Sequence, residues 1–267
     1  MALKIRHETV YRYAEPARQS VQNLKLTPRA EMRQRTLRWE MSAPGRRSEQ
    51  IDAHGNIVHL LSIDEPHEEI SIVVSGVVDV SSGAITRERG MLSPLVYLAP
   101  TSLTSADPAL MSLGLDYLSV PASTPGLRER LESLAGGVCS AISYVPGATT
   151  VTDTAASALA RGEGVCQDQA HVFLACCRAA SVPARYVSGY LHTGDGREIA
   201  SHAWIDAWLG DDVGWLGLDV THRRAVDDRY CRLAVGRDYL DAAPVRGVRR
   251  GGGGETLEVM VTVTTEQ

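Results

Sequence analysis

One cysteine of this sequence stands where cysteine chemistry is easiest. Cys166 follows the segment Gly162-Glu163-Gly164-Val165, in which two glycines let the backbone turn sharply before a predicted helix. At the first turn of a helix, unpaired N–H groups and the helix dipole favour a thiolate, which is the nucleophilic form of cysteine. This segment alone supports two interpretations: Cys166 is a nucleophile, or it is a buried cysteine that fills a gap between helix and sheet.

A nucleophilic cysteine needs a base and a group that orients the base, and both residue types follow along the chain. His202 begins a predicted strand in Ser201-His202-Ala203-Trp204, and Asp219 ends the next apolar strand. If these strands are antiparallel neighbours, Asp219 lies next to His202, where a carboxylate fixes the imidazole tautomer and stabilises the imidazolium. Since a histidine at a strand start is more often structural, the spacing alone does not decide its role.

The elements that must position these residues begin with a β-rich segment. The first ninety residues alternate between polar and apolar side chains and are interrupted by turn clusters, which predicts a small antiparallel sandwich or barrel. The predicted strands in this segment are 4–13, 36–41, 56–61 and 69–78.

Helices and strands are mixed after about residue 90. Leu127, Leu131, Leu134, Val138 and Ile142 recur at spacings of four, three, four and four, which predicts one apolar helix face. Further predicted elements are a capped helix at 155–161, the Cys166 helix to about 180, strands at 184–190, 202–209 and 214–221, and a final strand at 257–264 after a glycine hinge. We divide the chain into an N-terminal β-rich domain (1–90), a catalytic core (91–250) and a hinge with a C-terminal strand (251–267).

Four ordered blocks of sequence carry a resemblance to a known family. They are 164–171, 182–190, 201–204 and 214–221. Together they resemble the transglutaminase-like superfamily, and within it the bacterial transglutaminase-like proteins described as cysteine proteases. The resemblance implies an α+β fold, in which an N-terminal antiparallel β domain precedes a papain-like core with the cysteine helix packed on an antiparallel sheet. It also implies a triad of Cys166 as nucleophile, His202 as base and Asp219 as orienting acid, although Asp219-Val220-Thr221 stands where the family usually has Asp-Pro-Thr.

Other residues are candidates for supporting roles in such a site. The backbone N–H of Cys166 is one expected oxyanion donor. Tyr144, an aromatic residue before the nucleophile, and Gln167, directly after it, are further oxyanion candidates. Trp204 and Asp168 are candidates for lining the site. Their alternative roles are packing within the sheet for Trp204 and a favourable helix-start carboxylate for Asp168.

The expected activity is thiol-dependent acyl transfer on amide bonds through a thioester intermediate. We expect hydrolysis of a peptide-like substrate, as in a peptidase, amidase or deamidase, because water competes well at an open site. One alternative is protein-glutamine transamidation. Another is a non-catalytic protein-binding module with a vestigial triad.

Composition and charge exclude several other classes of protein. Hydrophobic residues are 44% and charged residues 22%, which excludes disorder over the whole length. The net charge of −5 and the sparse aromatic residues argue against nucleic-acid binding, so the arginines of 29–38 are expected to form a solvated β face. We find no apolar run of 18 residues and no secretory signal, and we therefore expect a cytoplasmic protein whose partner is a peptide or protein substrate and not a membrane.

We expect neither a metal nor another cofactor. The sequence has no Cys-x-x-Cys and no His-Glu-x-x-His motif. His171 is considered as a metal ligand together with His202 and His222, but a packed histidine is favoured. The five cysteines are expected to be free thiols, with Cys176 and Cys177 in the core of their helix, and Cys231 in a charged turn.

Overall fold

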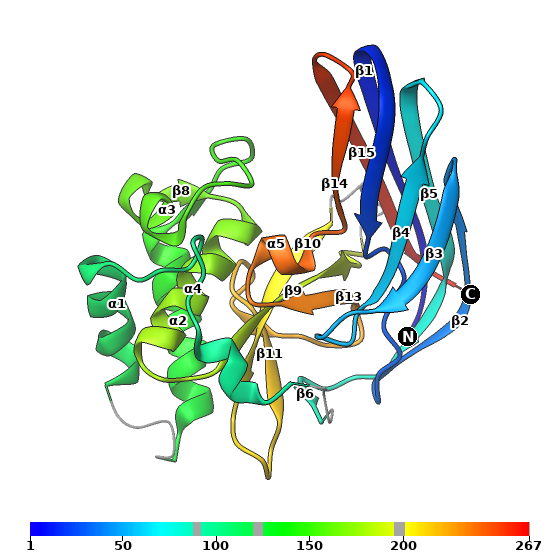
Figure 1. Cartoon of the computed structure of the whole chain (residues 1–267). Helices are drawn as coiled ribbons and strands as arrows, with labels where there is room; N and C mark the ends of the chain where they lie inside the picture. The colour runs from blue at the N-terminus through cyan, green and yellow to red at the C-terminus, as the bar shows by residue number, and fades with distance from the viewer. Residues whose placement is uncertain (88–91, 120–124, 195–200, 267) are drawn as a thin grey trace.

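A computed structural model describes residues 1–87, 92–119, 125–194 and 201–266, and it shows the predicted α+β architecture. Three layers follow one another across the molecule (Figure 1). Helices form the first layer, a six-stranded sheet the second and a curved seven-stranded sheet the third. None of the helices in the described residues is long and apolar enough to cross a membrane.

The seven-stranded sheet is antiparallel and holds both ends of the described chain. Its central path is β2-β5-β1-β4-β3, and the two C-terminal strands β14 and β15 also pair with β1. Residues 245–265 therefore join the N-terminal β domain and not the core sheet. The strands are β1 (Ala2–Leu24), β2 (Gln34–Ser42), β3 (Arg46–Ile51), β4 (Ile57–Ile63), β5 (His67–Val80), β14 (Val245–Gly251) and β15 (Glu255–Thr265).

Strand β1 is much longer than the alternation at 4–13 predicts. Its first half pairs with β5 and β15, and its second half pairs with β4 and β14. The register with β5 shifts between Arg12 and Ala17, the segment that contains Pro16. Proline donates no ladder hydrogen bond and is therefore tolerated at such an irregularity. Since β1 pairs with neighbouring strands both before and after this point, the strand continues past it.

Two features of this sheet differ from the sequence predictions. Strand β3 was not predicted, because all six of its side chains are exposed and its sequence lacks apolar alternation; charged side chains suit such an edge strand. The prediction of a solvated arginine face was wrong for Arg29, which is buried. Its Nε lies 3.1 Å from Glu31 Oε1 and its Nη1 donates to Asn56 Oδ1 at 3.0 Å, so partners replace the water that burial removes.

The six-stranded sheet has helices on one face and the seven-stranded sheet on the other. Its central path is β12-β11-β10-β9-β13, and β6 pairs with β11. Its strands are β6 (Ile85–Thr86), β9 (Ala184–Leu191), β10 (His202–Trp208), β11 (Trp215–Asp219), β12 (Arg224–Ala225) and β13 (Tyr230–Gly236). Cys231 lies in β13 with its side chain buried in the core between the sheets, so its predicted place in a charged turn was wrong.

The helical layer follows the predicted periodicity closely. The predicted apolar stripe is buried on α2, and Thr154 caps α3 by accepting from Ser157 N–H at 3.1 Å. Cys176 and Cys177 are buried in α4, as predicted. The helices of this layer are α1 (Pro108–Leu118), α2 (Leu127–Ala141), α3 (Ala155–Arg161) and α4 (Cys166–Ala179), with the short parallel pair β7 (Ser143–Tyr144) and β8 (Glu163–Gly164). The short helices η1 (Pro94–Leu98) and α5 (Tyr239–Ala242) lie apart from them, beside the middle sheet.

A buried charge cluster joins the strands of the middle sheet. Asp206 of β10 accepts from Arg185 Nε of β9 at 2.9 Å and from Arg232 Nη2 of β13 at 2.9 Å. Arg232 also approaches Glu31, which lies between β1 and β2 of the other sheet, with 3.4 Å between Nε and Oε2. The Asp206 carboxylate is fully buried, and although burial disfavours its charge, the two guanidinium groups hold its pKa below the usual value.

We predict that Asp206→Asn lowers the free energy of unfolding by about 3–5 kcal/mol, because it leaves two buried arginines without their common anion. Urea denaturation at pH 7 measures this change. The matched control is Asp64→Asn, whose partner Arg46 is largely exposed, and it should change the free energy of unfolding by less than about 1 kcal/mol. Equal effects of the two substitutions would show that the buried cluster does not stabilise the fold in this way.

Candidate active site

Cys166 is the first residue of α4, directly after the sharp turn that the sequence predicts. Gly164 permits this turn, since a Cβ there would lie 2.7 Å from the Cβ of Asp168. The side chain of Cys166 is partly exposed, whereas Cys176, Cys177 and Cys231 are buried. Burial raises the pKa of Cys176 to about 12, so that thiol stays protonated at neutral pH. Among these four cysteines, Cys166 is the one that solvent and a substrate can reach.

His202 lies between Cys166 and Asp219. Its Nε2 is 2.8 Å from Asp219 Oδ2, and the ring also interacts with the Cys166 side chain. Strands β10 and β11 are antiparallel neighbours with Ile205 opposite Leu218, and this register brings the start of one strand to the end of the other. The structure therefore brings together the three residues that the sequence singles out.

Asp219 accepts hydrogen bonds from two further side chains that the sequence analysis did not identify as part of the site. Tyr230 donates its hydroxyl to Oδ2 at 2.8 Å, and His222 Nδ1 lies 2.7 Å from the same oxygen. The backbone N–H of His222 donates to Oδ1 at 3.1 Å. His222 follows Asp219 by three residues in a turn, a spacing that was visible in the sequence, but Tyr230 comes from β13 and no local pattern marks it.

The electrostatics of this cluster favour a charged pair. Burial disfavours the charged form of His202, but hydrogen bonds to Asp219 and Cys166 outweigh it and raise the pKa of His202 to about 10. Burial also disfavours the Asp219 carboxylate, and the hydrogen bonds from His202 and His222 outweigh this effect and hold its pKa far below the usual value. At neutral pH, His202 is therefore an imidazolium beside an ionised carboxylate.

Asp168 supports the turn before Cys166 through two hydrogen bonds. Its Oδ2 accepts from the Val165 N–H at 2.8 Å and from the Thr149 hydroxyl at 2.6 Å. The carboxylate thus caps the helix start and fixes the loop before it. Asp168 is not among the described residues that line the hollow at Cys166.

Trp204 packs behind His202 and also lies outside that lining. Its ring stacks on the imidazole with 6.3 Å between ring centroids and 29° between ring planes, and it contacts the Tyr230 ring edge-on at 5.4 Å. A Cβ on Gly189 would lie 2.4 Å from the indole, so glycine there makes room for the ring. Trp204 therefore restricts the orientation of the His202 imidazole by stacking on one face of the ring.

A hollow of about 310 Å³ opens above Cys166 and His202. Tyr144 and Gln167, the two side-chain candidates for oxyanion donors, both line it. Burial, together with the charges of Cys166 and Asp219, raises the pKa of Tyr144, so its hydroxyl keeps a proton that it can donate. The backbone N–H of Cys166 also lies in the first turn of α4, where N–H groups have no acceptor within the helix.

The three residues that could bind a metal ion together include Asp219 in place of His171. The ligand atoms of His202, Asp219 and His222 lie within 4.8 Å of one another. His171 is fully buried elsewhere, where its Nε2 accepts the Tyr239 N–H at 3.1 Å, and its ring packs against Tyr186. The three convergent groups hydrogen-bond to one another through Asp219.

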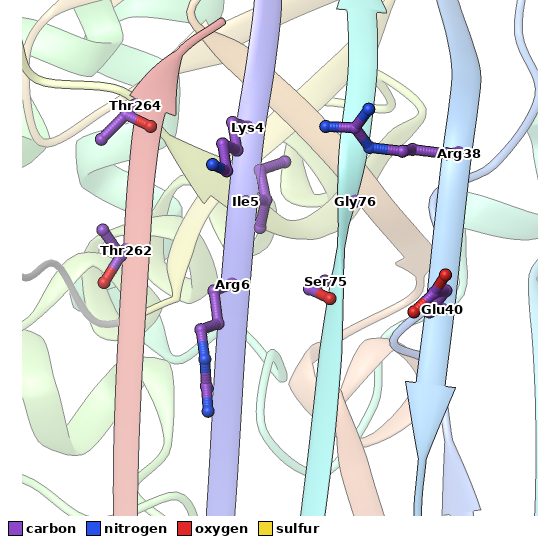
Figure 2. A pocket seen from close by; sticks show the side chains of 9 residues that line it. All are labelled: Lys4, Ile5, Arg6, Arg38, Glu40, Ser75, Gly76, Thr262 and Thr264. Carbon is purple, nitrogen blue, oxygen red and sulfur yellow. The ribbon is translucent and has the colours of Figure 1, made fainter.

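A larger hollow of about 450 Å³ lies on the outer sheet, away from the thiol. Figure 2 shows that its lining side chains come from β15, β1, β5 and β2. Two of its cations already have carboxylate partners: Arg6 lies 3.0 Å from Glu8, and Arg38 lies 2.6 Å from Glu266. It shares no lining residue with the hollow at Cys166, and it contains no thiol or imidazole. Size alone therefore does not identify the reactive site of this molecule.

Comparison with known proteins agrees with this architecture. Residues 3–79 match the family described as the bacterial transglutaminase-like N-terminal region, and residues 117–220 match the transglutaminase-like superfamily. The uncharacterized protein ML0607 of Mycobacterium leprae is 33% identical over 98% of this chain and 98% of its own length. The uncharacterized protein Rv2569c of Mycobacterium tuberculosis is 34% identical over 92% of this chain and 86% of its own length.

A solved structure shares the fold along the whole chain. It is the crystal structure of a "Putative Cysteine Protease" from Cytophaga hutchinsonii, with a TM-score of 0.80 and 22% sequence identity over 100% of this chain and 91% of that one. The matched segment 117–220 spans Cys166, His202 and Asp219, and the segment 3–79 spans the first five strands of the outer sheet. The chain therefore belongs to the transglutaminase-like superfamily and carries the N-terminal region of its bacterial members.

Proposed function

We propose that this protein is a thiol-dependent enzyme that cleaves amide bonds of peptide-like substrates through a thioester on Cys166. The observation that supports this most directly is the chain of contacts from Cys166 through His202 to Asp219, at the wall of an open hollow. A reachable thiol, a base and a carboxylate that orients the base are the three parts that nucleophilic acyl transfer requires.

The geometry supports the following roles. The Cys166 thiolate attacks the amide carbonyl carbon, and the developing oxyanion accepts hydrogen bonds from the Cys166 N–H and from Tyr144 or Gln167. The C–N bond then breaks as His202 gives its proton to the leaving nitrogen, which leaves an acyl thioester. His202 next takes a proton from water as the water oxygen attacks the thioester, and the C–S bond breaks to restore the thiolate.

We favour hydrolysis over transfer to an amine. The hollow at Cys166 is open to solvent, so water reaches a thioester there without a conformational change. Among the described residues that line it there is no Asp or Glu that would bind a protonated amine acceptor. Transamidation remains the second outcome of the chemistry, since both reactions share the acyl-enzyme.

The test offers peptide, isopeptide and glutamine-containing substrates, each with and without an excess primary amine, and identifies products by mass. Hydrolytic products that persist in the presence of the amine support the proposal. Amine adducts as the main product would assign transamidation instead. Cys166→Ala is the negative control. If this variant retained full turnover, Cys166 would not be the nucleophile.

We predict that Cys166 reacts with iodoacetamide at pH 6–7 at least about tenfold faster than the partly exposed Cys139 does, since His202 stabilises the thiolate. His202→Ala should bring the two rates to within about threefold of each other. Peptide mapping by mass over pH 5–9 measures both rates. If Cys166 in the wild-type protein reacts no faster than Cys139, a non-catalytic binding module becomes the better description.

We also predict that Asp219→Asn moves the alkaline limit of turnover to lower pH. In the wild-type protein the pKa of His202 is raised to about 10, so His202 keeps the proton that the leaving nitrogen needs until the pH approaches that value. Without the Asp219 charge, the opposing effect of burial is no longer fully offset and the pKa of His202 falls. Turnover at pH 8 should then fall by at least about tenfold.

The measurement is kcat/KM from pH 5 to pH 10.5. Tyr230→Phe is the matched comparison, because it removes one hydrogen bond to Asp219 and keeps the charge. Its alkaline limit should move by less than one pH unit. An unchanged profile in Asp219→Asn would contradict the orienting role of this carboxylate.

A further inference from the structure

A second, smaller hollow of about 80 Å³ lies next to the hollow at Cys166. Three residues line both: Ser201, Tyr239 and Pro244. Ser201 directly precedes His202, so the two hollows meet beside the base. We call the smaller hollow the β arm pocket, because its far wall comes from β1 and β15 of the outer sheet. In Figure 1 these strands rise beside α5, on the side of the middle sheet away from the helices.

The wall of the β arm pocket is an apolar face that no other part of the described chain covers. Leu257 and Val259 are 53% and 42% exposed. Side chains alternate along a strand, so they share a face with Val261 and Val263, which are buried in the core between the sheets. The apolar face of β15 thus continues beyond the core and ends beside the candidate active site.

The floor of this pocket is polar but uncharged. His7 lies 2.8 Å from the Tyr190 hydroxyl through Nδ1 and 2.8 Å from the Thr9 hydroxyl through Nε2. Burial lowers the pKa of His7 to about 4, so the ring is neutral at pH 7. Of the nearby strand charges, Arg12 and Glu258 face the other side of the sheet, where Arg12 Nη1 donates to Glu258 Oε2 at 2.8 Å. Glu255 shares the face of Leu257, and its carboxylate is already paired with Arg249, with 3.1 Å between Oε2 and Nε.

The same absence of charge extends into the first hollow. Among the described residues that line the two hollows there is no Asp, Glu, Lys or Arg. A charged substrate side chain would lose its water in the β arm pocket without gaining an ionic partner, which is costly. An apolar side chain would instead bury surface against Leu257 and Val259.

We propose that the β arm pocket is a specificity subsite for an uncharged, apolar side chain of the peptide substrate, next to the bond that Cys166 attacks. This inference rests on the proposed function and adds the class of substrate. It also gives the N-terminal β domain and the C-terminal strand a part in recognition, since both supply the wall of the subsite.

The test compares iodoacetyl-leucine amide, iodoacetyl-lysine amide and iodoacetyl-glutamate amide, with iodoacetyl-glycine amide as the reference. Each alkylates Cys166 by forming a carbon–sulfur bond as iodide leaves, and peptide mapping gives the rate. The leucine probe should react at least about tenfold faster than the lysine and glutamate probes. Leu257→Lys should lower the ratio of leucine to glycine rates about tenfold and leave the glycine rate unchanged.

Met260→Lys is the matched control, because Met260 is 50% exposed on the same strand but points to the opposite face. It should retain the ratio of the wild-type protein. Val259→Lys repeats the test on the pocket face if Leu257→Lys lowers the melting temperature. Two results would overturn the subsite: equal labelling rates for all four probes, or an equal fall in the leucine-to-glycine ratio in Leu257→Lys and Met260→Lys. In both cases fast labelling by the glycine probe would still show that the Cys166 thiol is reactive. A glycine probe that labels Cys166 no faster than Cys139 would overturn the proposed function and the subsite with it.

Discussion

The geometry of the candidate site depends on the hydrogen-bond donors that surround one buried carboxylate. Asp219 has no exposed surface, and its burial would be costly without hydrogen-bond donors. The donors come from three separate places: His202 at the start of β10, His222 in the turn after β11, and Tyr230 at the start of β13. Each donor must arrive within about 3 Å, so the strand ends that carry them are fixed relative to one another. The hydrogen bonds that this single buried anion requires thus align the His202 imidazole with helix α4.

A second buried anion holds the same sheet further along β10. Asp206 binds Arg185 of β9 and Arg232 of β13, and Arg232 reaches Glu31 in the segment between β1 and β2. On the face of the middle sheet toward the β domain, this cluster adds directional polar contacts to the apolar core between the sheets, whereas the core toward α4 is mainly apolar. Directional contacts fix register and hydrophobic contacts provide most of the burial, so the two kinds of contact contribute different things to a rigid site.

The sequence predicted those parts of the fold and site that local patterns encode. The turn before Cys166, the apolar stripe of α2 and the strand that begins at His202 all leave a short-range signal, and adjacency of two successive strands brought Asp219 near the base. Tyr230, the burial of Arg29 and the second half of β1 depend on partners far along the chain, and β3 lacks apolar alternation altogether.

The pairing of β1 with β15 joins Leu3 to Thr265, which are almost the full length of the described chain apart. During synthesis on a ribosome, β1 emerges long before β15, and one edge of its first half has no partner until β15 is made. An open edge of that length can pair with another nascent chain, and contacts between such distant segments form slowly. A chaperone that shields this edge until β15 has emerged would therefore raise the fraction of the protein that reaches its native state.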